Sequence, residues 1–146
     1  MTTALLDRLI PRAVAKRIPI LVDPYPEVDW SKYRGATLIK ANRRESLFAC
    51  PDKPDDARRC VKLTRRFNAT MVITLLAPGM VVAKGNEASQ IPAYPRRVRD
   101  TCGAGDAVLA LLADSMPTET LRQVCQRAAA MAADQVSTLG VTRLAV

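Results

Sequence analysis

Apolar residues in the first part of the chain recur at the spacing of an amphipathic helix. Between Ala4 and Lys16 they stand at positions 5, 6, 9, 10 and 14, which share one side of a helix. Pro11 falls inside this stretch, where a missing amide N–H is expected to kink or shorten the helix. Two short apolar runs follow, over residues 18–22 and 36–39. Both predict buried strands, each ending at polar residues that open a loop.

The rest of the chain alternates in the same way. Acidic residues at 55–56 begin a predicted helix, and residues 71–76 form a third apolar strand. A Pro-Gly turn then leads to a hairpin partner over 80–83, followed by a polar loop over 84–90. Two helices are expected over 104–114 and 118–136. Strands separated by helices predict an α/β fold with a largely parallel sheet covered by helices.

Length and composition agree with this picture. The chain has 146 residues, of which 49% are hydrophobic and only 4% aromatic. A single domain with a core of small aliphatic side chains is therefore expected. No apolar run reaches the roughly 18 residues of a membrane-spanning helix, and Met1–Leu6 is too short for a secretory signal. These features predict a cytoplasmic protein without a membrane partner.

The reactive residue types exclude several kinds of site. The sequence has no histidine, and its four cysteines (Cys50, Cys60, Cys102 and Cys125) form no CxxC pair. A structural zinc site is not favoured, and Ser-His or Cys-His nucleophiles are excluded. Acid–base chemistry would fall to carboxylates, lysine or tyrosine.

The net charge of +8 leaves three interpretations open. It is typical of a nucleic-acid partner, of an anionic substrate, or of a basic solvated surface. The basic residues are dispersed pairs with no interleaved aromatic side chains, so a nucleic-acid partner is not favoured.

The strongest chemical signal is the segment Asp100–Asp106, with the sequence DTCGAGD. Its glycines precede an apolar helix, and the free N–H groups of a helix start favour a phosphate or a developing phosphoryl charge. Asp106 stands beside these groups, where a carboxylate can accept a proton from an attacking alcohol. The alternative is a tight turn with an acidic residue in the first helical turn, and these residues alone do not decide between the two.

The segment resembles the DTxGAGD signature of the ribokinase-like (PfkB-type) carbohydrate kinases. Asn42–Glu45 is similar to the NxxE motif of that family. Residues 21–24 (LVDP) and 29–38 (DWSKYRGATL) resemble the heptose-7-phosphate kinases of ADP-heptose synthesis. The resemblance runs from about residue 5 to residue 144 and covers the C-terminal half of such a kinase. It implies a three-layer ribokinase-like fold, with residues 1–146 as one truncated domain.

The resemblance also implies ATP and Mg²⁺ as cofactors and heptose 7-phosphate as the acceptor. Asp106 would be the catalytic base, while Asn42 and Glu45 would organise Mg²⁺ around the phosphates. Asn42 and Glu45 also read as a helix cap with its reciprocal glutamate, and Asp23 as a turn residue or a substrate contact. The anion hole and nucleotide site would include Gly79, Thr101, Gly103, Ala104 and Gly105.

The sequence departs from the family at several positions. The chain begins at a helix that the family has in mid-protein, so the sugar-binding half is expected from elsewhere, or a homodimer completes the protein. Leu76 stands where a glycine is expected near the nucleotide, and Tyr25 replaces a lysine. Ala130 and Asp134 replace residues near the adenine pocket. A catalytically inactive remnant, or a half-domain that needs a partner, is therefore the alternative to an active kinase.

Overall fold

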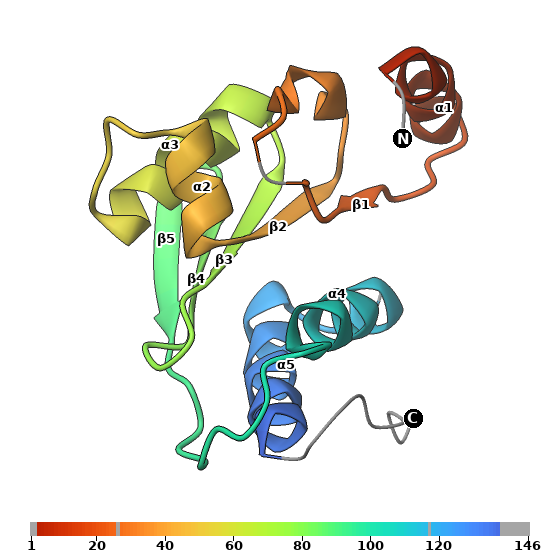
Figure 1. The fold of residues 1–146 in the computed structure, drawn as a ribbon. Helices are drawn as coiled ribbons and strands as arrows, with labels where there is room; N and C mark the ends of the chain where they lie inside the picture. Colours follow the sequence, from red (N-terminus) through yellow and green to blue (C-terminus); the bar gives the residue numbers. More distant parts are fainter. Residues whose placement is uncertain (1–2, 26, 117, 138–146) are drawn as a thin grey trace. The chain divides into compact units, whose positions relative to one another are not determined.

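The computed structural model describes residues 3–25, 27–116 and 118–137. In chain order the helices and strands in Figure 1 are α1 (Thr3–Ala15), β1 (Leu21–Val22), the 3₁₀ turn η1 (Trp30–Tyr33), β2 (Leu38–Asn42), α2 (Arg43–Ala49), α3 (Asp56–Phe67), β3 (Thr70–Thr74), β4 (Met80–Lys84), β5 (Glu87–Ile91), α4 (Ala104–Ser115) and α5 (Leu121–Val136). None of the described helices has both the length and the apolar character needed to cross a membrane.

The strands form a five-stranded sheet in the order β1-β2-β3-β4-β5. β1 and β2 are parallel, with Leu21 opposite Leu38 and Val22 opposite Ile39. The connections over 75–79 and 85–86 are too short for a parallel crossover, so β3, β4 and β5 form an antiparallel meander. The sheet is therefore mixed, and the hairpin predicted across Pro78-Gly79 is confirmed.

The polar loop predicted over residues 84–90 is wrong, because most of it is the strand β5. Its side chains are largely exposed, and only Ile91 is buried. A polar strand at the edge of a sheet shows no apolar alternation, so periodicity could not find it. The usable signal was the dipeptide Gly85-Asn86 between two short runs, which is typical of a tight hairpin. Gly85 has the positive φ of 64° that such turns require.

Three further boundaries differ from the prediction. α1 continues through Pro11 to Ala15, whereas β1 covers only the end of the predicted strand. β2 extends to Asn42, and the short helix α2 follows it directly, so two helices rather than one separate β2 from β3. α1 packs closely against the chain at Gly35, since a Cβ at that glycine would lie 2.7 Å from Ile10 Cγ2.

A buried arginine holds the region between α2 and α3. The Arg59 side chain is fully buried, and its Nε donates to Ser46 Oγ at 3.0 Å. Its Nη1 donates to the carbonyls of Lys53 and Pro54 at 2.8 and 3.0 Å, and its Nη2 pairs with Asp56. Because every side of the guanidinium meets an acceptor, its charge is tolerated in the interior.

The chain divides into two compact units, Met1–Ile73 with Val81–Ser89 and Thr74–Met80 with Gln90–Val146. The first contains α1, α2, α3 and most of the sheet. In the second, α4 and α5 pack against each other through buried residues that include Leu112, Val124, Cys125 and Ala128.

Gly79 is the position where the fold should tolerate a side chain least. Its φ is +92°, and a Cβ would overlap the Ile91 carbonyl oxygen and the Ala93 amide nitrogen. We expect Gly79→Ala to lower the free energy of unfolding by about 3 kcal/mol or more, measured by urea denaturation. Gly85→Ala is the control, because Gly85 also has a positive φ but nothing within 4 Å of its Cβ. It should cost about 1 kcal/mol; equal costs for the two variants would contradict the packing described for Gly79.

Candidate active site

The start of α4 is open to a ligand. Gly103 is its N-cap residue, with a left-handed φ of 74°, and as a glycine it has no side chain to cap the first helical turn. Ala107 N donates to Gly103 O at 2.9 Å, which begins the helical hydrogen bonding. The amides ahead of it, at Gly105 and Asp106, therefore lack an acceptor from a capping side chain. Such amides, with the positive end of the helix dipole, form an anion-binding site.

The loop that leads into α4 is tied to the end of α5. Arg99 N and Asp100 N both donate to Val136 O, at 2.7 and 3.2 Å. The buried Gln135 side chain donates from Nε2 to Cys102 O at 3.3 Å. The Asp100 carboxylate accepts from Cys102 N at 2.9 Å, which closes a turn inside the loop. These contacts fix the loop on both sides of Thr101 before the chain enters α4.

Asp106 lies in the first turn of α4 with its side chain exposed. Its neighbours Ala107 and Val108 are buried and anchor the helix, so the carboxylate emerges from a fixed backbone. Within the described part of the chain no hydrogen bond or ion pair engages this carboxylate. Asp106 is therefore available to accept a proton from a ligand bound at the helix start.

Asn42 and Glu45 form a complete capping box at the start of α2. Glu45 N donates to Asn42 Oδ1 at 2.9 Å, and Asn42 N donates to Glu45 Oε2 at 2.8 Å. The Asn42 side-chain amide also donates to Glu45 Oε1, at 2.6 Å. The structural reading of this motif is confirmed. Each Glu45 oxygen keeps a lone pair for a further contact, so the predicted metal role is neither required nor blocked.

Asp23 is held by Lys40, a residue that no sequence pattern marked as functional. Asp23 follows β1 and Lys40 lies in β2, where its side chain is only 6% exposed and pairs with the Asp23 carboxylate. A buried ammonium needs such a partner. The available signal was a lysine directly after the buried residues Leu38 and Ile39. The pairing itself depends on the parallel register, and the predicted substrate role of Asp23 stays a prediction.

The loop between β3 and β4 contains Leu76, which stands where the family resemblance predicts a glycine. Leu76 has a left-handed φ of 61°, which is the conformation that favours glycine, yet its side chain is 78% exposed. Leu75 N donates to Gly79 O and Gly79 N donates to Leu76 O, both at 2.8 Å, so the loop closes as a tight turn. Leucine instead of glycine at position 76 therefore strains the backbone of this turn, but its side chain points into solvent and does not enter the interior.

The predicted site residues are divided between the two units. Asp23, Asn42 and Glu45 belong to the first unit, whereas Gly79, Thr101 and the segment 103–106 belong to the second. Among the described residues no group of three or more acidic or cysteine side chains gathers to hold a metal ion.

Comparison of the sequence with known proteins identifies a family. The sequence pattern of the pfkB family carbohydrate kinases matches residues 2–145. Proteins named bifunctional protein HldE are similar: that of Methylobacillus flagellatus is 30% identical over 98% of this chain, and that of Azorhizobium caulinodans 34% identical over 98%. The chain spans only 31% and 32% of the length of these two relatives.

Solved structures show the same fold. Phosphofructokinase-2 from Escherichia coli, in complex with potassium, matches with a TM-score of 0.83 and 21% identity, covering 96% of this chain and 48% of that one. Ribokinase from Arabidopsis thaliana, complexed with ribose and ATP, matches with a TM-score of 0.80 and 19% identity over 96% and 48% of the two chains. The predicted ribokinase-like α/β fold is confirmed.

The loop geometry makes a prediction about thiol reactivity. Asp100 raises the pKa of the exposed Cys102 thiol, first through a side-chain hydrogen bond and then through its charge. Asp100→Asn keeps the side-chain oxygen that caps Cys102 N but removes the charge. The thiol pKa should fall, the thiolate fraction near pH 8 should rise, and alkylation of Cys102 should become severalfold faster by mass spectrometry.

Cys125 supplies the internal control for this experiment. Burial raises the pKa of its thiol to about 12, so it should stay unmodified in both proteins. An unchanged Cys102 rate in Asp100→Asn would show that the carboxylate does not lie against this thiol.

Proposed function

The chain belongs to the pfkB family of carbohydrate kinases, and we propose that it is the nucleotide-binding and catalytic half of an ATP-dependent sugar kinase, one truncated ribokinase-like domain over residues 1–146. The observation that carries this proposal is the start of α4. There, backbone amides without a side-chain cap stand beside an Asp106 carboxylate that pairs with none of the described residues. Phosphoryl transfer needs both features: donors for the charge on the transferred group and a base for the attacking hydroxyl.

The proposed mechanism uses this chain's own groups. The Asp106 carboxylate takes the proton of the sugar hydroxyl as the hydroxyl oxygen bonds to the terminal phosphorus of ATP. The bond from that phosphorus to the bridging oxygen breaks, and ADP leaves with the electron pair. The amides of Gly103, Ala104 and Gly105 bind the negative charge on the phosphoryl oxygens, with Thr101 and Gly79 shaping the nucleotide side. The Gly103 and Gly105 amides need no reorganisation, because the contacts with α5 already hold the loop. The Ala104 amide would exchange its long 3.4 Å bond to Thr101 O for the phosphoryl oxygen.

Asn42 and Glu45 fit a supporting role toward Mg²⁺. When bound, Mg²⁺ would neutralise phosphate charge. Glu45 is 8% exposed, and its carboxylate accepts two hydrogen bonds from Asn42, so it is oriented before any ligand arrives. One such carboxylate, acting directly or through water, is the usual protein share of a Mg²⁺–nucleotide site.

The acceptor we propose is heptose 7-phosphate. Support comes from residues 21–24 and 29–38, which resemble the heptose-7-phosphate kinases, and from the similarity to proteins named HldE. Asp23 would contact the sugar. Its pairing with Lys40 orients the carboxylate after the end of β1, where ligands of parallel sheets bind. Cytoplasmic location fits an ATP-dependent activity.

A partner completes the proposed enzyme. The chain spans about half the length of the solved kinases it resembles, and orientation of the acceptor supplies much of the rate in such reactions. An inactive remnant or a binding half-domain is therefore the second candidate. α1 exposes an apolar flank formed by Leu5 and Leu9, one turn apart and 47% and 48% exposed, and β1 is an edge strand of the described sheet. We propose that this flank binds the sugar-binding half of the kinase. A second copy of this chain, in a homodimer, is the alternative partner for it.

Nucleotide binding tests the main proposal. Calorimetry should show that the chain binds Mg·ATP. Asp106→Asn should bind with an affinity close to that of the parent, because the amides remain, but any transfer to heptose 7-phosphate should fall by about 10²–10⁴-fold. Asp114→Asn is the matched control, since Asp114 is an exposed aspartate near the other end of the same helix. Absence of ATP binding by the parent chain would refute the kinase proposal, while binding without turnover would favour the half-domain.

The apolar flank of α1 predicts association. The parent chain should sediment as an associated species or bind a hydrophobic dye, and Leu5→Lys with Leu9→Lys should reduce either signal. Phe48→Lys is the control, because Phe48 is 52% exposed on α2, away from this flank. A monodisperse monomer that neither binds dye nor responds to detergent would contradict the proposed docking surface.

A further inference from the structure

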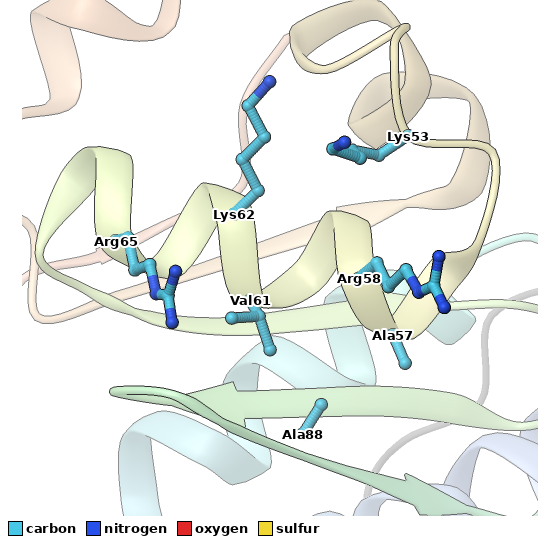
Figure 2. A pocket seen from close by; sticks show the side chains of 7 residues that line it. All are labelled: Lys53, Ala57, Arg58, Val61, Lys62, Arg65 and Ala88. Carbon is cyan, nitrogen blue, oxygen red and sulfur yellow. The ribbon is translucent and has the colours of Figure 1, made fainter.

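An open groove lies between α3 and β5, within the first unit. It has a volume of about 450 Å³. Figure 2 shows α3 running alongside the strands, with Ala57 and Val61 directed toward the sheet and Ala88 directed back toward the helix. The floor is therefore apolar and made of small side chains. The remaining lining residues are all cationic: Lys53, Arg58, Lys62 and Arg65.

The groove exists because α3 does not cover the last strand of the sheet. The buried side of α3 contacts β3 and β4: Cys60 Sγ lies 3.6 Å from Met71 O and 3.7 Å from Val81 O. Thr64 Oγ1 donates to Ala83 O at 3.3 Å, again on β4. β5 is the next strand out, and its Ala88 is only half-buried. The helix layer thus ends one strand before the sheet does.

The cations of the groove are spaced along one side of α3. Arg58, Lys62 and Arg65 stand at i, i+4 and i+7, which are neighbouring positions on a helix surface. Arg65 is fixed by a neutral partner, since its Nε donates to Asn86 Oδ1 at 2.8 Å. Lys62 pairs with Asp52 at 2.5 Å, so its charge is compensated.

The other two cations have no such partner. Among the described residues no hydrogen bond or ion pair engages the side chains of Lys53 and Arg58. The nearby Asp55 uses its carboxylate to cap α3, accepting from Arg58 N at 2.7 Å. The groove therefore keeps a surplus of positive charge along its length.

The edge of β5 adds a second binding element. β5 is the terminal strand of the sheet, and no other strand among the described residues pairs with its outer edge. Such an edge offers a row of backbone donors and acceptors to another extended chain. Side chains alternate between the faces of a strand, so Ala88 faces the groove while Glu87 and Ser89 face the other way.

We propose that the β5 edge and this groove together bind an extended acidic peptide segment of another protein. The segment would add to the sheet beyond β5, as peptides do at other open sheet edges. Its alternate side chains, about 7 Å apart, would face α3, whose turns advance by about 5.4 Å. Carboxylates at alternate positions can then reach Arg58, Lys62 and Arg65 in turn. This proposal does not rest on kinase activity.

Other occupants fit less well. A second copy of this chain would bring the same cations against each other across the edge, and like charges repel. Nor does the sequence contain three acidic residues at alternate positions, so its own segments do not match the groove. Single-stranded nucleic acid binds through aromatic stacking, and the lining has no aromatic side chain.

Fluorescence anisotropy with a short labelled peptide tests the proposal. The peptide carries Glu at alternate positions with Thr and Val between them, and the comparison peptide has the same composition with its Glu residues contiguous. We expect the alternating peptide to bind at least about tenfold more tightly, since only its carboxylates match the cations. Lys53→Glu with Arg58→Glu should abolish the binding. Neither side chain has a partner among the described residues, so this variant should fold.

The matched control is Lys16→Glu with Arg8→Glu, which changes the net charge equally on exposed positions of the α1 region. It should bind like the parent. Amide hydrogen exchange should slow at residues 87–91 on binding, because the edge becomes paired. Four outcomes would each overturn the proposal. They are equal binding of the two peptides, equal loss of binding in the two variants, β5 amides that are not protected on binding, and tighter binding of single-stranded RNA than of the peptide.

Discussion

The proposed chemistry depends on one constraint: the backbone amides at the start of α4 are held in place by a glycine N-cap that has no side chain to cap them. Gly103 turns the chain in a left-handed conformation, and Val136 and Gln135 of α5 bind the loop on both sides of Thr101. A helix start that is both ordered and uncapped keeps donors ready for an anion. Asp106 gains its proposed role from the same arrangement, because its carboxylate is exposed beside those donors on a packed helix.

In the first unit, unlike at the start of α4, several of the polar groups described above are paired with other groups of the same unit. Glu45 and Asn42 complete each other's hydrogen bonds, Lys40 neutralises Asp23, and Arg59 is enclosed by acceptors. Side chains that are already paired are also already oriented, so the structural and proposed functional readings of Asn42 and Glu45 support each other. The cations beside β5 contrast with this pattern, because no residue in the described part of the chain pairs with the side chains of Lys53 and Arg58.

Sequence predicted the features that depend on local patterns. Apolar spacing located α3 and α5, and the glycines of 103–106 marked the helix start. It failed where the outcome depends on distant parts of the chain. β5 is polar because it lies at an edge, and the Asp23–Lys40 pair exists only because β1 and β2 are parallel in one register. At Leu76 the resemblance predicted a glycine. The left-handed backbone at this position is the conformation that favours glycine, which is the physical reason for that expectation.

The most direct test of the central claim is nuclear magnetic resonance of backbone amides during titration with Mg²⁺ and a non-hydrolysable ATP analogue. We expect saturable shifts of the Gly103, Gly105 and Asp106 amide signals, because these groups would contact the phosphates. The same shifts are expected in Asp106→Asn, since the amides and not the carboxylate bind the anion. Saturable binding that leaves these three amides unmoved would contradict the claim that the start of α4 is the phosphate site.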